Sequence, residues 1–328
     1  MSSNKLLEPN PVEQDRVIAD LGSRDGPVLV VTCLIHGNEP AGEHAVRRVL
    51  ARLEQSDLSA FEGRLVILRG NRGAAARDLR FIDRDLNRIF PTELVPPAKE
   101  VSSRDAEYSE RNDLLARIET LADEHPEGKR YFVDFHTTSS ETLPYLSLPS
   151  ADDNLRQFAS RFPLHRVVGF ADEVGGSIDR FFYERGFLGF ACEGGQHERT
   201  GSATSMEALL WMMLSATGVF PESNGGTPDE AKEARATLDR YVVGDPHEFE
   251  IIYRHRLTGQ EGFRMNPGYA NFHRVADKEV IARDKKGDIR VPHEGYLLMP
   301  LYQAAGNDGF FLVRRSSSPL EEREALEV

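Results

Sequence analysis

The feature that most constrains the fold is an apolar run that stops at a histidine. Residues 28–35 are mostly apolar and rich in β-branched side chains, as expected for a buried strand, and His36 and Gly37 follow directly. Glu39 precedes a proline that suits the first turn of a helix. Apolar residues then recur at helical spacing: Ala41, Ala45, Val46, Val49, Leu50 and Leu53. His36 and Glu39 are therefore expected at the carboxyl edge of a sheet, where α/β proteins place their chemistry.

An imidazole and a carboxylate on one tight turn can bind the same zinc ion, each about 2 Å from the metal. A lone His-x-x-Glu pattern is more often a helix-capping loop whose polar residues face water. Here, however, a strand over 131–136 also ends in a histidine, His136, and Glu193 follows the apolar run 187–192. Two histidines and one carboxylate form a typical catalytic zinc site, and a further glutamate supplies a general base. Asp134 lies on the same strand face as His136 and is placed to orient it.

The remaining pattern alternates strands with helices. Further strands are expected at 17–19, 64–70, 145–148 and 165–170, and helices at about 105–124 and 204–217. Thr204 and Glu207 form a capping-box pattern that predicts the start of the second helix. This alternation predicts an α/β fold with a mixed, largely parallel sheet flanked by helices on both faces.

The character of the chain changes at Glu222–Pro228, a linker by composition. After it come short β-like runs separated by Gly, Pro and Asp, at 249–253, 278–282, 296–301 and 309–313. We therefore predict a catalytic domain over 1–222, a smaller C-terminal all-β domain over 229–315, and a mobile tail over 316–328.

Composition excludes several classes of partner. Among 328 residues, 53 acidic and 40 basic side chains give a net charge of −13, which argues against binding to nucleic acid or to anionic membranes. No apolar run is long enough to span a bilayer, and no signal peptide is recognised. Cys33 and Cys192 both lie in apolar runs, which predicts buried reduced thiols and a soluble, cytoplasmic protein. The oligomeric state stays open, a homo-oligomer included.

Four motifs together resemble a known family. His36–Glu39, Arg80–Arg88, Asp134–Thr138 and Glu193–Gly195 look, in this order, like the signatures of the succinylglutamate desuccinylase/aspartoacylase family, which has the zinc carboxypeptidase fold. The resemblance covers about residues 28–195, and four motifs in order are far more specific than any one of them.

The resemblance implies one Zn²⁺ per chain and a role for each matched residue. The roles are zinc ligand for His36, Glu39 and His136, general base and acid for Glu193, contact with the scissile carbonyl for Arg80, and grip on a substrate carboxylate for Asn87 and Arg88. A zinc-bound water has a pKa of about 7, and a guanidinium can hold a carboxylate with two parallel hydrogen bonds. The expected activity is hydrolysis of the amide bond of a small anionic N-acyl amino acid.

Because of two departures from the family pattern, the sequence does not assign every residue of the pocket. Gly194 stands where the named enzymes usually carry a bulkier apolar residue, which predicts a different pocket floor. No C-terminal tyrosine or additional arginine can be matched to an acyl-side carboxylate, so the acyl group and the amino acid stay unassigned. Arg180 and Arg185 are considered for a second carboxylate, with ordinary surface charge as the alternative.

Two other functions compete with the deacylase. A zinc carboxypeptidase acting on short peptides would use the same site, although a C-terminal domain that restricts the pocket favours small substrates. A metal- or ligand-binding protein without catalysis is the third interpretation, and the presence of both Glu193 and Arg80 argues against it.

Overall fold

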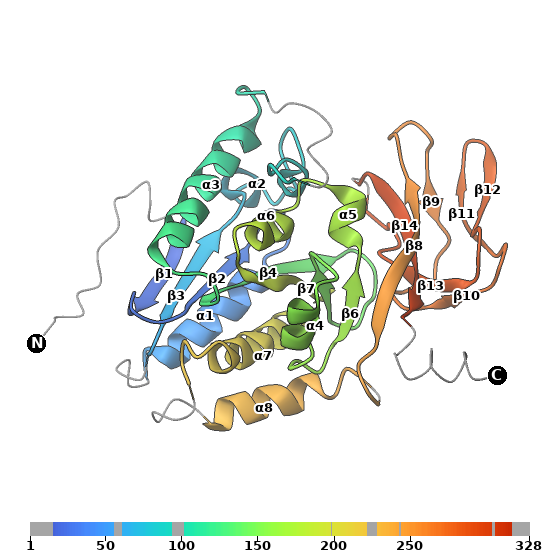
Figure 1. The fold of residues 1–328 in the computed structure, drawn as a ribbon. Helices are drawn as coiled ribbons and strands as arrows, with labels where there is room; N and C mark the ends of the chain where they lie inside the picture. Colours follow the sequence, from blue (N-terminus) through green and yellow to red (C-terminus); the bar gives the residue numbers. More distant parts are fainter. Residues whose placement is uncertain are drawn as a thin grey trace, which may run out of the picture.

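A single large sheet forms the frame of the molecule (Figure 1). The computed structural model describes residues 16–55, 61–93, 102–197, 199–221, 228–242, 244–303 and 306–316. Within these residues an 11-stranded sheet has the order β1-β3-β2-β4-β7-β5-β6-β8-β14-β13-β10, and β12-β11-β9 form a separate 3-stranded sheet.

The strands and helices have the following bounds. The strands are β1 (Val17–Gly22), β2 (Val28–Cys33), β3 (Arg64–Arg69), β4 (Arg130–Thr138), β5 (Tyr145–Leu148), β6 (His165–Val168), β7 (Leu188–Gln196), β8 (Glu248–Arg256), β9 (Arg264–Met265), β10 (Arg274–Val275), β11 (Val280–Asp284), β12 (Gly287–Arg290), β13 (Gly295–Leu298) and β14 (Asp308–Arg315). The helices are α1 (Ala41–Leu53), α2 (Arg72–Ala75), α3 (Ala106–Glu124), α4 (Asp153–Ala159), α5 (Phe170–Val174), α6 (Ile178–Glu184), α7 (Thr200–Ala216) and α8 (Pro228–Leu238), with a 3-10 turn η2 (Leu86–Arg88).

The centre of the sheet is parallel and covered on both faces. β3, β2, β4 and β7 are parallel neighbours, while β1 pairs antiparallel at the edge. Side chains of β2 alternate between two cores: Leu29 and Val31 pack with α1, α4, α7 and α8, whereas Val28 and Val30 pack with α3 and α6 (Figure 1). This confirms the mixed, largely parallel sheet with helices on both faces that the sequence predicts.

The C-terminal strands fall into two groups: β8, β14, β13 and β10 extend the large sheet, and β9, β11 and β12 form the separate 3-stranded sheet. The predicted runs at 249–253, 278–282, 296–301 and 309–313 correspond to β8, β11, β13 and β14, and β6 pairs in parallel with β8. Residues 222–227 of the predicted linker and 317–328 of the predicted tail lie outside the described residues, so the boundary between 222 and 229 stays a prediction. Helix α8, which the sequence analysis did not anticipate, packs Ala234 and Leu238 into the core beside α7.

Two element ends differ from expectation for local reasons. The helix predicted to start at Thr204 begins one turn earlier, at Thr200, because Ser202 and Ser205 donate hydrogen bonds to the Gln196 and Gly194 carbonyls of β7. Packing on β7 outweighs the capping-box signal. The strand expected to reach residue 170 stops at Val168, because the next residue, a glycine with φ of +88°, starts α5.

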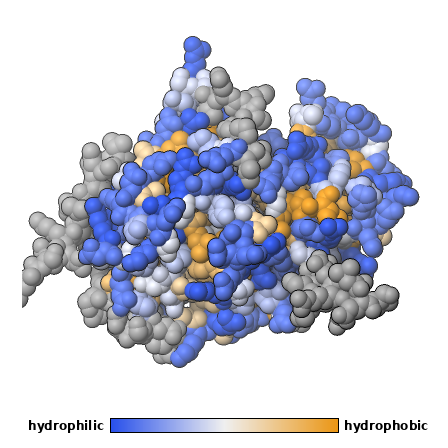
Figure 2. Space-filling model, viewed as in Figure 1, coloured by the Kyte–Doolittle hydropathy of each residue, from blue (hydrophilic) through white to orange (hydrophobic). Residues whose placement is uncertain are grey.

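The molecular surface is largely hydrophilic in the view of Figure 2. Hydrophobic residues gather mainly where the C-terminal strands join the rest of the sheet. In the described part of the chain, no helix combines the length and the apolar character needed to cross a bilayer. Both cysteines are buried free thiols, as predicted, and burial raises the pKa of each.

Candidate active site

The backbone brings three predicted site segments to one edge of the sheet. β2, β4 and β7 are adjacent and parallel, so His36 just beyond β2 lies at the same edge as His136 and Glu193, which are paired across β4 and β7. Leu34, with φ of +60°, turns the chain after β2. Gly37 then passes so close to α2 that a Cβ would lie 2.3 Å from the Ala74 carbonyl carbon.

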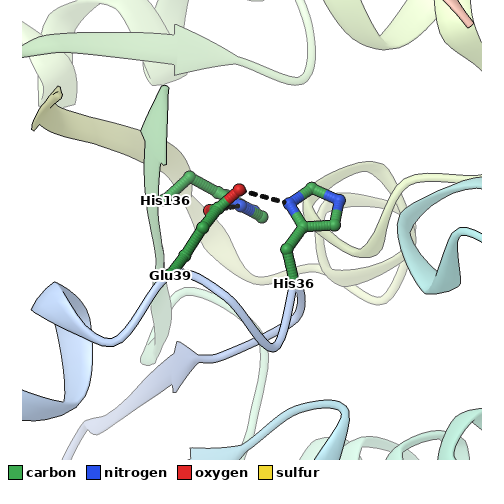
Figure 3. A group of neighbouring side chains, drawn as sticks. All are labelled: His36, Glu39 and His136. Carbon is green, nitrogen blue, oxygen red and sulfur yellow. Dashed lines mark hydrogen bonds and ion pairs between the residues drawn. The ribbon is translucent and has the colours of Figure 1, made fainter. Parts of the chain in front are cut away.

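The two histidines converge on one carboxylate (Figure 3). His36 Nδ1 lies 2.9 Å from Glu39 Oε1, and His136 Nδ1 lies 3.1 Å from Glu39 Oε2. The Thr137 amide also donates to Glu39 Oε2 at 3.0 Å, which fixes the carboxylate between the rings. All three side chains are buried, and their ligand atoms lie within 4.8 Å of one another.

Further carboxylates hold the outer nitrogen of each ring. His136 Nε2 lies 2.6 Å from Asp134 Oδ2, and Thr32 Oγ1 donates to Asp134 Oδ1 at 2.6 Å. His36 Nε2 lies 3.1 Å from Asp85 Oδ1. Each imidazole is thus oriented by a carboxylate with Nδ1 turned inward, which is how metal-binding histidines are commonly held. The expectation that Asp134 orients His136 is confirmed.

The donor set suits a divalent cation. Two imidazole nitrogens and a carboxylate are preferred zinc ligands. Among the described residues, three carboxylates, Glu39, Asp85 and Asp134, bond to the two histidines, against one guanidinium, that of Arg80, beside them. Although burial opposes it, Asp134 and Glu39 raise the pKa of His136 well above its usual value. Burial likewise opposes ionisation of Glu39, but His36 and His136 hold its pKa well below normal. A bound cation would take the place of these protons.

Glu193 lines the same cavity without joining this cluster. Its side chain is buried, and Oε2 has no hydrogen-bond partner within the described residues. Burial raises the pKa of Glu193 to about 7, with His136 opposing the rise and Glu39 adding to it. A carboxyl group with a pKa near neutrality can both accept and return a proton.

The loop after α2, together with η2, supplies the cationic side of the cavity. Arg80 donates to Glu39 Oε1 at 3.4 Å and to Asp85 Oδ2 at 3.2 Å, so its guanidinium is held beside the histidines. Arg88 is largely buried, lines the cavity, and lies with its guanidinium carbon 5.9 Å from the centroid of the Phe170 ring. Asn87 also lines the cavity, and its side-chain oxygen accepts the Ile178 amide at 2.9 Å.

Known proteins with the same sequence pattern and fold identify the family. The model of the succinylglutamate desuccinylase/aspartoacylase catalytic domain matches residues 25–217, more than half of the chain. The chain belongs to the succinylglutamate desuccinylase/aspartoacylase family. A succinylglutamate desuccinylase from Pseudomonas paraeruginosa is 35% identical over 74 residues, a stretch that spans only 22% of either protein.

Solved structures of the family share the fold over most of the chain. A succinylglutamate desuccinylase/aspartoacylase from Rhodobacter sphaeroides has a TM-score of 0.65 at 16% identity, covering 91% of this chain and 87% of that one. Murine aminoacylase 3 has a TM-score of 0.59 at 16% identity, covering 90% and 97%. The family model and these solved structures agree on the family and on the fold.

The departures from the family pattern have structural explanations. A Cβ at Gly194 would lie 2.5 Å from the Met206 side chain of α7, and Gly194 does not line the cavity. The small residue therefore serves packing of β7 on α7, whereas the expected change in the pocket floor stays a prediction. Arg180 bonds to Glu184 and to the Pro149 carbonyl, and Arg185 bonds to Glu119, so neither faces the cavity.

Sequence reasoning missed several residues that build the site. Asp85 lies inside the Arg80–Arg88 motif but received no role from the sequence, and it bridges His36 and Arg80. Glu107, fully buried on α3, accepts three consecutive backbone amides, at 82–84, and thereby shapes the Arg80 loop. Asp179 also lines the cavity, and no motif or periodicity in the sequence marks it as a site residue.

Proposed function

We propose that this protein is a zinc-dependent hydrolase that cleaves the amide bond of a small N-acyl amino acid. One observation carries the proposal: His36, Glu39 and His136 converge in a buried cluster, and Glu193, whose Oε2 has no hydrogen-bond partner among the described residues, lines the same cavity. This combination supports a hydrolytic metal site, because a purely structural metal site has all its ligand positions filled and needs no free base.

His36, Glu39 and His136 would hold the ion through two nitrogens and one oxygen. A zinc ion in such a site lowers the pKa of a bound water and polarises a carbonyl group. Asp134 and Asp85 would keep each imidazole in the tautomer that leaves Nδ1 free for the metal. We expect one ion per chain.

Glu193 would move the protons of the reaction. Its carboxylate takes a proton from the attacking water and returns it to the departing amine, and its pKa of about 7 suits both transfers. Arg80 would stabilise the negative charge that develops on the carbonyl oxygen during attack. Its bonds to Glu39 and Asp85 hold the guanidinium in place before substrate arrives, so little reorganisation is needed.

Arg88 would bind the carboxylate of the amino acid, together with Asn87. A guanidinium can form two parallel hydrogen bonds with a carboxylate, and this one is partly buried and lines the cavity. The Arg88 Nη1 bond to the Asn87 carbonyl, 2.8 Å long, orients the group.

The C-terminal strands favour a deacylase over a carboxypeptidase. Residues from the segment before β14 and from β14 itself also line the cavity: Met299, Pro300, Leu301, Gln303, Gly306, Asn307, Asp308 and Phe311. This wall restricts the space beside the metal cluster, which suits a small acyl amino acid better than a peptide chain.

Amine release from matched substrates tests the proposal. Zinc-loaded protein should release amine from N-acetyl and N-succinyl amino acids faster than from C-terminal dipeptides, and protein treated with a chelator should release none until zinc is restored. Faster cleavage of the dipeptides would favour the carboxypeptidase, and zinc binding without any hydrolysis would favour a binding protein.

A further inference from the structure

The cavity has a second polar corner that the proposed mechanism does not use. It consists of Asp179 in the first turn of α6, Ser177 just before that helix, and Ser147 on β5, and we call it the Asp179 corner. All three residues line the cavity, and their exposed fractions are 4%, 2% and 4%. Atoms this deeply buried are normally hydrogen-bonded within the protein.

The polar groups of the Asp179 corner are short of partners. Asp179 Oδ1 accepts the Arg180 amide at 2.9 Å, and no side-chain cation in the described part of the chain forms an ion pair with this carboxyl. The Ser147 and Ser177 hydroxyls lack hydrogen-bond partners there as well. The neighbouring Arg180 guanidinium is turned away, toward Glu184 and the Pro149 carbonyl.

A buried carboxyl without a counter-ion is unfavourable. Burial raises the pKa of Asp179, and the Asp134 carboxylate raises it further. The Ser177 hydroxyl, the Arg180 amide and His136 oppose this rise without cancelling it. Such a group costs several kcal/mol when ionised unless a cation or several donors complete its surroundings. An incoming group with positive charge and several N–H donors would satisfy Asp179 and both serines at once.

The Asp179 corner adjoins the residues proposed to bind the carboxylate. The Ile178 amide donates to Asn87 Oδ1 at 2.9 Å, and the Phe90 amide donates to the Gly176 carbonyl at 3.0 Å. The segment leading into Asp179 is therefore tied on both sides of Arg88. Arg88, proposed to meet the α-carboxylate of the amino acid, and the Asp179 corner line the same cavity, so both can contribute to binding one amino acid.

We propose that the Asp179 corner binds a side-chain ammonium group, so that the preferred substrates are Nα-acyl derivatives of diamino acids. This inference rests on the proposed amide hydrolysis and specifies its substrate class. Acidic substrates such as N-acylaspartate would place a second carboxylate beside Asp179, where like charges repel. The hydroxyl oxygens of Ser147 and Ser177 would accept hydrogen bonds from the remaining ammonium N–H groups, and a methyl group in the same place could donate none.

A substrate panel that varies only the side-chain end tests this inference. Zinc-loaded protein is assayed for kcat/KM on Nα-acetyl diamino acids with two to four methylenes before the ammonium, on neutral amino acids of equal length, and on N-acetylaspartate and N-acetylglutamate. The best diamino acid should exceed its neutral counterpart by about 10- to 100-fold, as expected for a buried hydrogen bond to a charged group.

Charge removal at the corner provides the second arm. Asp179→Asn should lower the ratio of kcat/KM for cationic over neutral substrates at least tenfold, whereas Asp153→Asn, at a fully exposed carboxyl on α4, should leave this ratio unchanged. A wild-type preference for neutral or acidic substrates overturns the inference and leaves the amide hydrolysis standing. Hydrolysis of no amide at all overturns both. An equal loss of kcat/KM on every substrate in Asp179→Asn would assign this carboxyl a structural role and would contradict the proposal that the Asp179 corner binds an ammonium group.

Discussion

Replacement of Glu193 by glutamine should separate catalysis from metal binding and from folding. The side chain of glutamine has nearly the same shape, and Oε2 has no partner within the described residues, so the amide replaces it without breaking a hydrogen bond seen in the structure. Zinc content should stay at the wild-type level, because Glu193 lies outside the His36, Glu39 and His136 cluster. Turnover should fall by about 10²–10⁴-fold, which corresponds to about 3–5 kcal/mol of activation free energy.

The same substitution should stabilise the metal-free protein at alkaline pH. Burial raises the pKa of Glu193 from 4.5 to about 7, so the folded wild type holds this proton more tightly than the unfolded chain. Its free energy of unfolding therefore falls as pH rises from about 5 to 8, whereas the glutamine variant has no such loss. The stability advantage of Glu193→Gln should grow by about 2–3 kcal/mol over this range.

Both effects can be measured on one pair of proteins with one control. Urea unfolding at pH 5 and pH 8 gives the stability difference, elemental analysis gives zinc content, and amine release gives turnover. Glu294→Gln, at a carboxyl that is 72% exposed, serves as control and should match wild type in all three. Loss of zinc in Glu193→Gln would make Glu193 a ligand, and unchanged turnover would refute its role as proton shuttle.

Three further predictions follow from single contacts. His36→Ala and His136→Ala should each lose most of the zinc in elemental analysis, since each removes one of three protein ligands; full occupancy in both would refute the ligand assignment. Arg88→Lys should raise KM more than it lowers kcat in steady-state kinetics, because a single ammonium charge replaces a bidentate pair of hydrogen bonds. The reverse pattern would indicate that Arg88 acts in the chemical step rather than in substrate binding. Burial and the neighbouring His247 lower the pKa of His165 to about 4, and His165 Nδ1 accepts a hydrogen bond from the His247 amide. The free energy of unfolding of the wild type should therefore fall as pH drops from about 6.5 toward 4. Denaturant titrations should show a smaller fall in His165→Asn, and equal falls would count against this assignment.

Much of the fold could be predicted because its signals are local. The apolar runs at β2, β3, β4 and β7 predict buried parallel strands, and the histidines that follow two of them predict a shared edge. Helix α8 was missed because its buried residues in the described part are one alanine, Ala234, and one leucine, Leu238, which give little apolar periodicity. The helix is held by packing on α7.

The candidate site could be predicted only where its residues belong to motifs. His36, Glu39 and His136 stand at fixed offsets from strand ends, so their meeting followed from topology. Asp179 lies in a seven-residue helix that no pattern in the sequence predicts, and the position of Asp179 in the cavity depends on tertiary packing. Buried carboxyls of this kind resemble exposed ones in sequence, because burial is a property of the fold.

Stepwise zinc loading of metal-free wild-type protein tests the central proposal most directly. Bound zinc and the rate of amine release from an N-acyl amino acid would be measured in the same samples. If the account is right, activity rises from zero in proportion to bound zinc and stops rising at about one ion per chain. Full activity before zinc is added, or a saturated zinc site with no amine release, would contradict it.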